Sequence, residues 1–138
     1  MCQYVHARNA NAFPKRRDRN WQDLDVIATY MFAGLPVADY PTGYDWYVRL
    51  LERQADMFPH DGEAVWQLTP GGSIYVVEDI ERAGTGLVTV ALADLNAHEA
   101  RLRALDVAFT ERSDGDAPRR LVVKDIDGNT LTFFQDPK

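Results

Sequence analysis

The sequence is poor in cysteine and in histidine. Among 138 residues there is one cysteine, Cys2, and there are three histidines, His6, His60 and His98. A single cysteine beside the initiating methionine allows no internal disulfide and no Cys-x-x-Cys metal or redox motif. We therefore expect a reducing compartment, the cytoplasm, and a chain short of imidazole bases.

Long apolar runs and nucleotide-binding or nucleophile motifs are also absent. No eighteen apolar residues run together and no signal-peptide stretch opens the chain, so the sequence predicts neither secretion nor a membrane partner. Gly71-Gly72 is not followed by the Lys-Ser/Thr of a phosphate loop, and there is no Gly-x-Ser-x-Gly motif. We expect no cofactor.

Acidic residues outnumber basic ones, and the net charge is −6. Residues 1–30 hold five of the fifteen basic residues but three of the twenty-one acidic ones, which leaves the remainder of the chain at −8. Such a body repels phosphate backbones, argues against a nucleic-acid partner and favours cationic ligands. The basic run Lys15–Arg19 is most simply a solvated tail.

The first 28 residues differ from the rest. Residues 1–20 have neither a helical nor a strand period and contain Pro14, which indicates a flexible or loosely docked extension. From Trp21 to Ala28 the apolar spacing predicts a short helix that lies over the domain. We therefore divide the chain into an extension, 1–28, and one domain, 29–138, since its length supports one core.

An internal repeat of about 55 residues organises the domain. FAGLPVAD at 32–39 matches LVTVALAD at 87–94, and each strand-like run ends in an aspartate that can cap a following helix. AVWQLT, SIYVVED, DVAFTE, RLVVKD and TLTFFQD then read as strands separated by turns, with SIYVVED and TLTFFQD offset by 57. The sequence thus predicts an α+β fold of two βαβββ modules, whose curved, partly open mixed sheet surrounds a pocket.

The segments GLPVADYPTGYDWYVRLL, LVTVALADLNAHEARLRAL and VVKDIDGNTLTFFQD support a family resemblance. Across residues 31–136 the chain resembles the vicinal oxygen chelate superfamily, the glyoxalase, bleomycin resistance and extradiol dioxygenase fold. The most specific pieces are the Asp125–Asn129 turn and the pair Trp46-Tyr47. Ile126 stands where the family usually has proline, and Glu52 follows Leu51 where a helix-ending glycine is common. The resemblance also implies a homodimer.

The resemblance implies four metal-ligand positions, which members of this superfamily fill with His or Glu. Counting along the matched strands, those positions carry Phe32, Tyr75, Leu87 and Thr132. None is a usual ligand for a divalent ion at neutral pH, and a one-residue slip brings no better donor inward. The sequence therefore predicts a domain without a metal site.

The same strand faces provide a candidate ligand pocket. If the four positions face inward, alternation brings Thr89 and Phe134 to the same surface, and Trp66 on the intervening strand could stack on a ligand. The predicted pocket residues are Phe32, Tyr75, Leu87, Thr132, Thr89, Phe134 and Trp66. A mostly apolar surface with a few hydroxyls suits a small organic molecule, although a solid, ligand-free core remains the alternative.

The remaining polar candidates have simple explanations. His60, Asp61 and Glu63 lie in a turn-like stretch and are expected to be solvated. His98 follows Asp94 by four residues on a predicted helix, where it pairs with that carboxylate or, as we favour, faces water. We identify no catalytic residue.

We consider three functions. The first is a metal-independent protein that binds a hydrophobic or aromatic compound, and the acidic body favours a cationic one. The second is a glyoxalase- or lyase-like enzyme in which Tyr75 and Thr132 act on a carbonyl substrate; no base of near-neutral pKa is visible for it, so whether the chain is an enzyme stays open. The third is a structural or dimerisation module.

Overall fold

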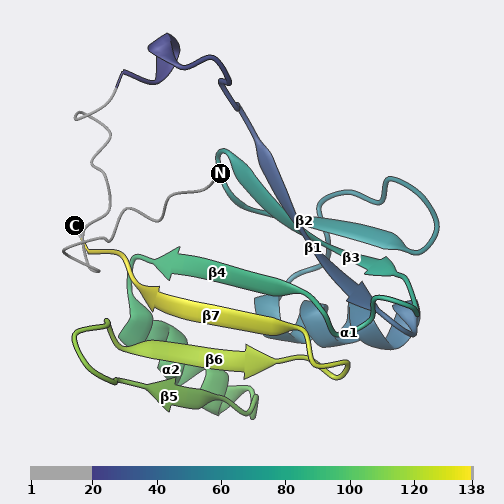
Figure 1. The fold of residues 1–138 in the computed structure, drawn as a ribbon. Helices are drawn as coiled ribbons and strands as arrows, with labels where there is room; N and C mark the ends of the chain where they lie inside the picture. The colour runs from purple at the N-terminus through teal and green to yellow at the C-terminus, as the bar shows by residue number, and fades with distance from the viewer. Residues whose placement is uncertain (1–19, 138) are drawn as a thin grey trace.

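The computed structural model describes residues 20–137 (Figure 1). The basic run Lys15–Arg19 and most of the predicted extension lie outside the described residues. The predicted helix at Trp21–Ala28 is reduced to a single 3-10 turn, Trp21–Asp23, which projects away from the sheets instead of covering them (Figure 1). The other elements are β1 (Met31–Val37), α1 (Tyr40–Leu51), β2 (Glu63–Thr69), β3 (Gly72–Glu78), β4 (Leu87–Leu92), α2 (Leu95–Ala104), β5 (Thr110–Arg112), β6 (Arg120–Lys124) and β7 (Thr130–Gln135).

The strands form two sheets that repeat one topology. One has the order β1-β3-β2 and the other β4-β7-β6-β5; β1 is parallel to β3 as β4 is to β7. Gly34 pairs with Tyr75, and Thr89 pairs with Thr132. These two pairs are related by the offsets of 55 and 57 found in the sequence, so the predicted internal repeat and the α+β fold are confirmed.

The first half has one strand fewer than the second. Only an isolated bridge between Met57 and Val65 stands where a third strand after α1 was expected. The amides of Asp56 and Met57 both donate to the Val65 carbonyl, and the chain then turns through Pro59 and Gly62, which has φ 83°. Proline cannot donate to a ladder and a left-handed glycine ends it, so this segment makes one contact instead of a strand.

Both helices begin at the aspartates that the sequence pattern identified. The Asp39 carboxylate accepts a hydrogen bond from the Thr42 amide, and the Asp94 carboxylate accepts one from the Ala97 amide, which satisfies donors at the two helix starts. Helix α1 ends at Glu52, which adopts the left-handed conformation, φ 57°, that glycine usually supplies.

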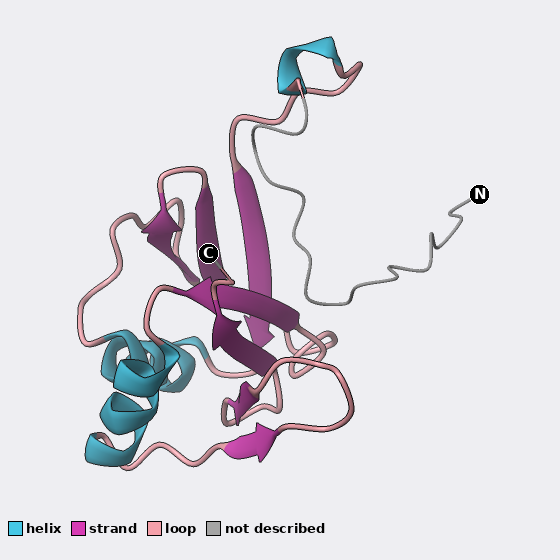
Figure 2. Cartoon of the chain, turned by 90° about the vertical axis from the view of Figure 1, so that its left-hand side faces the viewer, coloured by secondary structure: helices cyan, strands magenta, loops and turns pink. Residues whose placement is uncertain are grey.

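One core lies between the sheets and the helices. Figure 2 shows both helices on one side of the strands, and the side chains facing them are buried. The fully buried side chains come from both halves: Leu35, Val37, Tyr47, Leu50, Trp66, Val76, Leu102, Leu121, Val123 and Leu131. Among residues 20–137, no helix is long and apolar enough to cross a membrane.

The Asp125–Asn129 turn holds the halves together. The buried Asp125 carboxylate accepts hydrogen bonds from the Tyr47 hydroxyl and the Asn129 amide, each 2.8 Å, and from the backbone amides of residues 127–129. Asn129 also donates to the Pro36 carbonyl at 2.7 Å and accepts from the Gly86 amide at 2.7 Å. The two most specific motif pieces of the sequence therefore meet in one buried polar network that joins α1, β1 and the second half.

Candidate functional site

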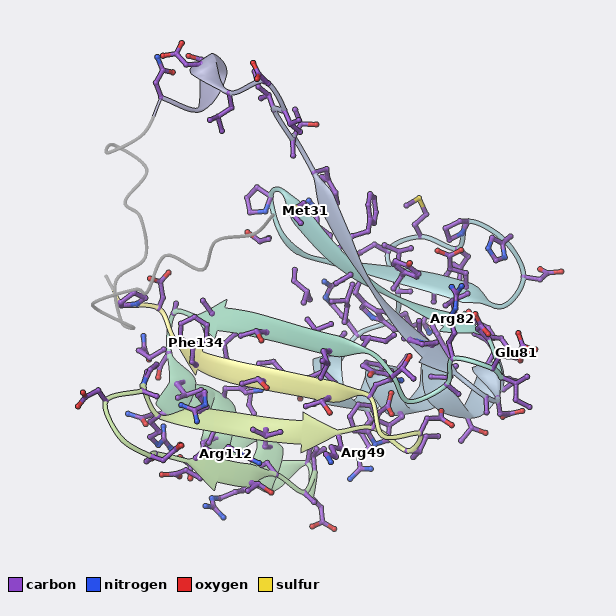
Figure 3. All side chains as sticks on the ribbon, viewed as in Figure 1. Met31, Arg49, Glu81, Arg82, Arg112 and Phe134 are labelled. Atoms are coloured by element: carbon purple, nitrogen blue, oxygen red, sulfur yellow. The ribbon has the colours of Figure 1, made fainter. Side chains whose placement is uncertain are left out.

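A cleft separates the two sheets at one end. Strands β1 and β4 are the outer strands of their sheets, and they approach at Gly34 and Gly86, where an added Cβ on Gly86 would lie 3.1 Å from the Gly34 carbonyl oxygen. Toward Met31 and Leu92 they enclose a cavity of about 680 Å³. Figure 3 places Met31 and Phe134 on the two separate sheets that flank this gap.

The wall of the cleft is mostly apolar. Met31–Ala33 and Gly72–Ile74 contribute from one sheet, Val88–Leu92 and Phe133 from the other, and Leu51 from the end of α1. Seven side chains of the wall carry hydrogen-bonding groups: Arg53, Thr69, Ser73, Thr89, His98, Arg101 and Asp136. A concave apolar surface with a few polar groups is the usual composition of a small-molecule site.

Most polar side chains of the wall already have partners. The Ser73 hydroxyl shares a 2.5 Å hydrogen bond with the Tyr30 hydroxyl. Arg53 binds both carboxylate oxygens of Asp56, at 2.7 and 2.8 Å. Arg101 donates to the Glu52 carboxylate at 2.7 Å and to the Leu50 carbonyl at 3.1 Å, which explains why a glutamate is useful at the end of α1.

The structure brings together only part of the predicted pocket. Phe32 and Thr89 line the cleft. Tyr75, Thr132 and Phe134 are half-buried and do not line this cavity, because they alternate along β3 and β7 with Ile74 and Phe133, which do line it. The Tyr75 ring lies against Gly34, where an added Cβ would be 2.6 Å from the phenol, so this glycine allows a close approach that no other residue would.

Leu87 and Trp66 take places that differ from the prediction. Leu87 is 82% exposed at the start of β4 and does not line the cleft. Trp66 is fully buried on the helix side of β2: its ring stacks on Tyr44 at 5.5 Å between centroids, and its Nε1–H donates to the Arg53 carbonyl at 3.0 Å. The prediction that Trp66 stacks on a ligand is wrong for this structure, because strand alternation turns it into the core.

His98 is a site residue that the sequence reasoning misplaced. It does not face water: it is 6% exposed, lines the cleft and packs on the Phe133 ring at 4.3 Å between centroids. Burial and then the neighbouring Arg101 charge lower the pKa of His98 from 6.5 to about 4, so it is neutral at pH 7. The signal was present, since His98 stands three residues after Leu95 and four before Leu102, on the buried stripe of α2.

The prediction of a solvated turn holds for His60 and Asp61 but not for Glu63, which is half-buried at the start of β2. His60 and Asp61 are exposed, and Nε2 of His60 lies 2.5 Å from a carboxylate oxygen of Glu63. This group lies outside the cleft wall.

The four positions implied as metal ligands do not fit a metal ion. Phe32 and Leu87 carry no donor atom, and the remaining two offer an aromatic and an aliphatic hydroxyl, which are weak ligands for a divalent ion at neutral pH. Within residues 20–137 no three His, Cys, Asp or Glu side chains are grouped closely enough to hold one. We derive no metal-dependent step for this site.

Several solved structures are similar to this chain. A glyoxalase/bleomycin resistance protein from Catenulispora acidiphila is 31% identical, with a TM-score of 0.73, and the match covers 78% of this chain and 98% of that one. Two others share the fold at lower identity. The antibiotic-binding protein TnmS3 from a Streptomyces species is 22% identical, with a TM-score of 0.63 and coverage of 79% and 96%.

The second is the bleomycin-binding protein of bleomycin-producing Streptomyces verticillus in complex with copper(II)-bleomycin, which is 21% identical, with a TM-score of 0.62 and coverage of 77% and 94%. No protein-family profile and no curated protein matches the sequence. The identity and coverage of the Catenulispora protein, together with the repeated topology described above, show that this chain belongs to the glyoxalase/bleomycin resistance family of the vicinal oxygen chelate superfamily.

Proposed function

We propose that this protein binds a small, largely apolar organic molecule in the cleft between β1 and β4, and that binding needs no protein-held metal ion. The observation that carries the proposal is the cavity of about 680 Å³ with a mostly apolar wall and a few polar side chains. Antibiotic- and bleomycin-binding proteins among the similar folds support the same class of function.

The charges of the wall refine the ligand class. The wall contains two guanidinium groups, Arg53 and Arg101, and one carboxylate, Asp136, while His98 is neutral. It therefore offers little to a cation, although the acidic body as a whole would attract one over longer distances. We propose a neutral aromatic ligand in place of the cationic one that composition alone favoured.

The enzymatic alternative gains no specific support. It relied on Tyr75 and Thr132, and neither residue lines the cleft. Turnover of a methylglyoxal–thiol adduct without added metal would favour the enzyme over the binding protein. The homodimer implied by the resemblance remains a separate prediction, which sedimentation velocity tests.

A thermal-shift screen tests the proposal with neutral, anionic and cationic aromatic compounds. A compound present at one hundred times its dissociation constant should add about 2.7 kcal/mol to the free energy of unfolding. Phe32→Ala removes a ring from the cleft wall, whereas Leu87→Ala removes an exposed apolar side chain outside it. We expect hits whose shifts are reduced by Phe32→Ala and unchanged by Leu87→Ala; equal effects of the two variants would place the ligand elsewhere.

A further inference from the structure

One buried side-chain nitrogen in the wall of the cleft is left without a partner. Among the described residues, His98 Nε2 is the buried side-chain nitrogen or oxygen that makes no hydrogen bond. A buried polar group without a hydrogen bond is destabilising, so such groups are nearly always paired in folded proteins. By contrast, Ser73, Arg53 and Arg101 in the same wall are all paired.

The contacts of His98 determine which of its nitrogens carries the proton. Its Nδ1 lies 3.4 Å from Arg101 Nη1. A guanidinium group only donates hydrogen bonds, so Nδ1 must be the acceptor in this contact. Because a neutral imidazole has one N–H, the proton sits on Nε2, and the unpaired atom is a donor.

The missing partner is therefore a hydrogen-bond acceptor that residues 20–137 do not supply. The imidazole forms part of the cavity wall and packs on Phe133 at an interplanar angle of 52°, so an aromatic ligand entering the cleft would meet two packed rings. We propose that Nε2–H of His98 donates a hydrogen bond to an oxygen of the bound molecule, so that the cleft selects neutral aromatic compounds that carry a carbonyl group. This inference rests on the proposed function and names the chemical class of its ligand.

The bond requires a small movement of the wall, since less than 1 Å² of Nε2 is accessible. The imidazole is held by one long hydrogen bond from Arg101, and Arg101 is anchored independently by Glu52 and by the Leu50 carbonyl. A slight turn of the ring therefore breaks no strong interaction. The carbonyl bond would replace an unsatisfied donor, which favours the turn.

Three probes of one ring system separate the hydrogen bond from apolar contact: 2-acetylnaphthalene, which has a carbonyl acceptor, 2-ethylnaphthalene, which has none, and 2-naphthylmethylammonium, which is a cation. We expect the acetyl compound to bind about tenfold more tightly than the ethyl compound and the cation to bind most weakly. In the wild-type protein, the Nε2 and Hε2 resonances of His98 should shift with the acetyl compound and stay in place with the ethyl compound.

Two variants complete the test. His98→Phe keeps a ring against Phe133 without the donor and should bring the affinity for 2-acetylnaphthalene down to that for 2-ethylnaphthalene. His98→Gln keeps an N–H donor and should restore part of the preference. Equal affinities of the two compounds for the wild type, or an unshifted His98 resonance on binding, would overturn the inference. The resonance measurement uses the wild-type protein, so it does not depend on whether a variant folds.

The two proposals fail in different ways. If compounds from the wider screen bind in the cleft but His98 Nε2 is unaffected by their carbonyl groups, the inference is wrong and the proposed function stands. If no compound in that screen binds, both are wrong. Failure of all three naphthyl probes at millimolar concentration overturns the inference alone.

Discussion

The two ends of the contact region between the halves differ in chemistry: one is a buried polar network and the other is an apolar cavity. At one end Asp125, Asn129 and Tyr47 form a buried network in which all three side chains are hydrogen-bonded. At the other end β1 and β4 separate around an apolar cavity, and His98 keeps an unpaired donor. The difference shows how one contact region can both fix the orientation of two modules and leave room for a ligand.

The largest expected effect tests the closed end. Asp125→Ala removes the acceptor for Tyr47, Asn129 and three backbone amides, which should lower the free energy of unfolding by at least about 3 kcal/mol in urea denaturation. Asp127→Ala is the matched control in the same turn, since it loses one 3.3 Å bond from the Ala38 amide, and should cost under about 1 kcal/mol. Similar losses for both would mean that the turn, and not the network, matters.

A second pair of variants tests the assignment of the two aromatic rings, Trp66 to the core and Phe32 to the cleft. Trp66→Phe loses core volume and the bond to the Arg53 carbonyl, and should cost about 2 kcal/mol in stability with ligand affinity unchanged. Phe32→Ala, at a side chain 55% exposed, should change stability by less than about 0.5 kcal/mol yet weaken ligand binding. Titration of a screening hit and urea denaturation measure both; the reverse result would exchange the two roles.

The smallest effect concerns pH at the open end. The pKa of His98 is lowered from 6.5 to about 4 in the folded chain, so below pH 6.5 the unfolded state takes up a proton that the folded state does not. The stability that neutral His98 contributes to the folded state is therefore present above pH 6.5 and is lost as the pH falls toward 4. Around it, Arg101 is paired with Glu52, and the wall also contains the carboxylate of Asp136.

Between about pH 7 and 4.5 the wild type should lose about 1–2 kcal/mol more unfolding free energy than His98→Phe, measured by urea denaturation at each pH. Identical pH profiles for the two proteins would show that His98 is not held in its neutral form by burial.

Much of the fold was predictable because it repeats. The aspartates Asp39 and Asp94 marked both helix starts, and the offsets of 55 and 57 anticipated the pairing of Gly34 with Tyr75 and of Thr89 with Thr132. Helix capping and strand pairing occur within each module, so the same sequence pattern appears twice in one chain. The sequence did not predict that the first half lacks its third strand after α1. That segment forms a single bridge at Met57, and one bridge leaves no periodic pattern in the sequence.

The site was harder to predict, because it depends on how the modules are placed. Periodicity identified the faces that carry Phe32 and Thr89, but the separation of β1 from β4 comes from tertiary contacts distant in sequence, such as Asn129 with Pro36. The position of Trp66 was predicted wrongly because no repeat showed which face of β2 this residue occupies. His98 was misplaced because a polar residue type outweighed its position on the apolar stripe of α2.

The turn at Asp125–Asn129 has a consequence for how the chain can be divided. Its side chains hold the first half through Tyr47 and the Pro36 carbonyl, so the partnership does not depend on the covalent connector at residues 79–86. A nick in that connector should leave two fragments able to find each other again. That reassociation would depend on the carboxylate of Asp125, the amide of Asn129 and the phenol of Tyr47.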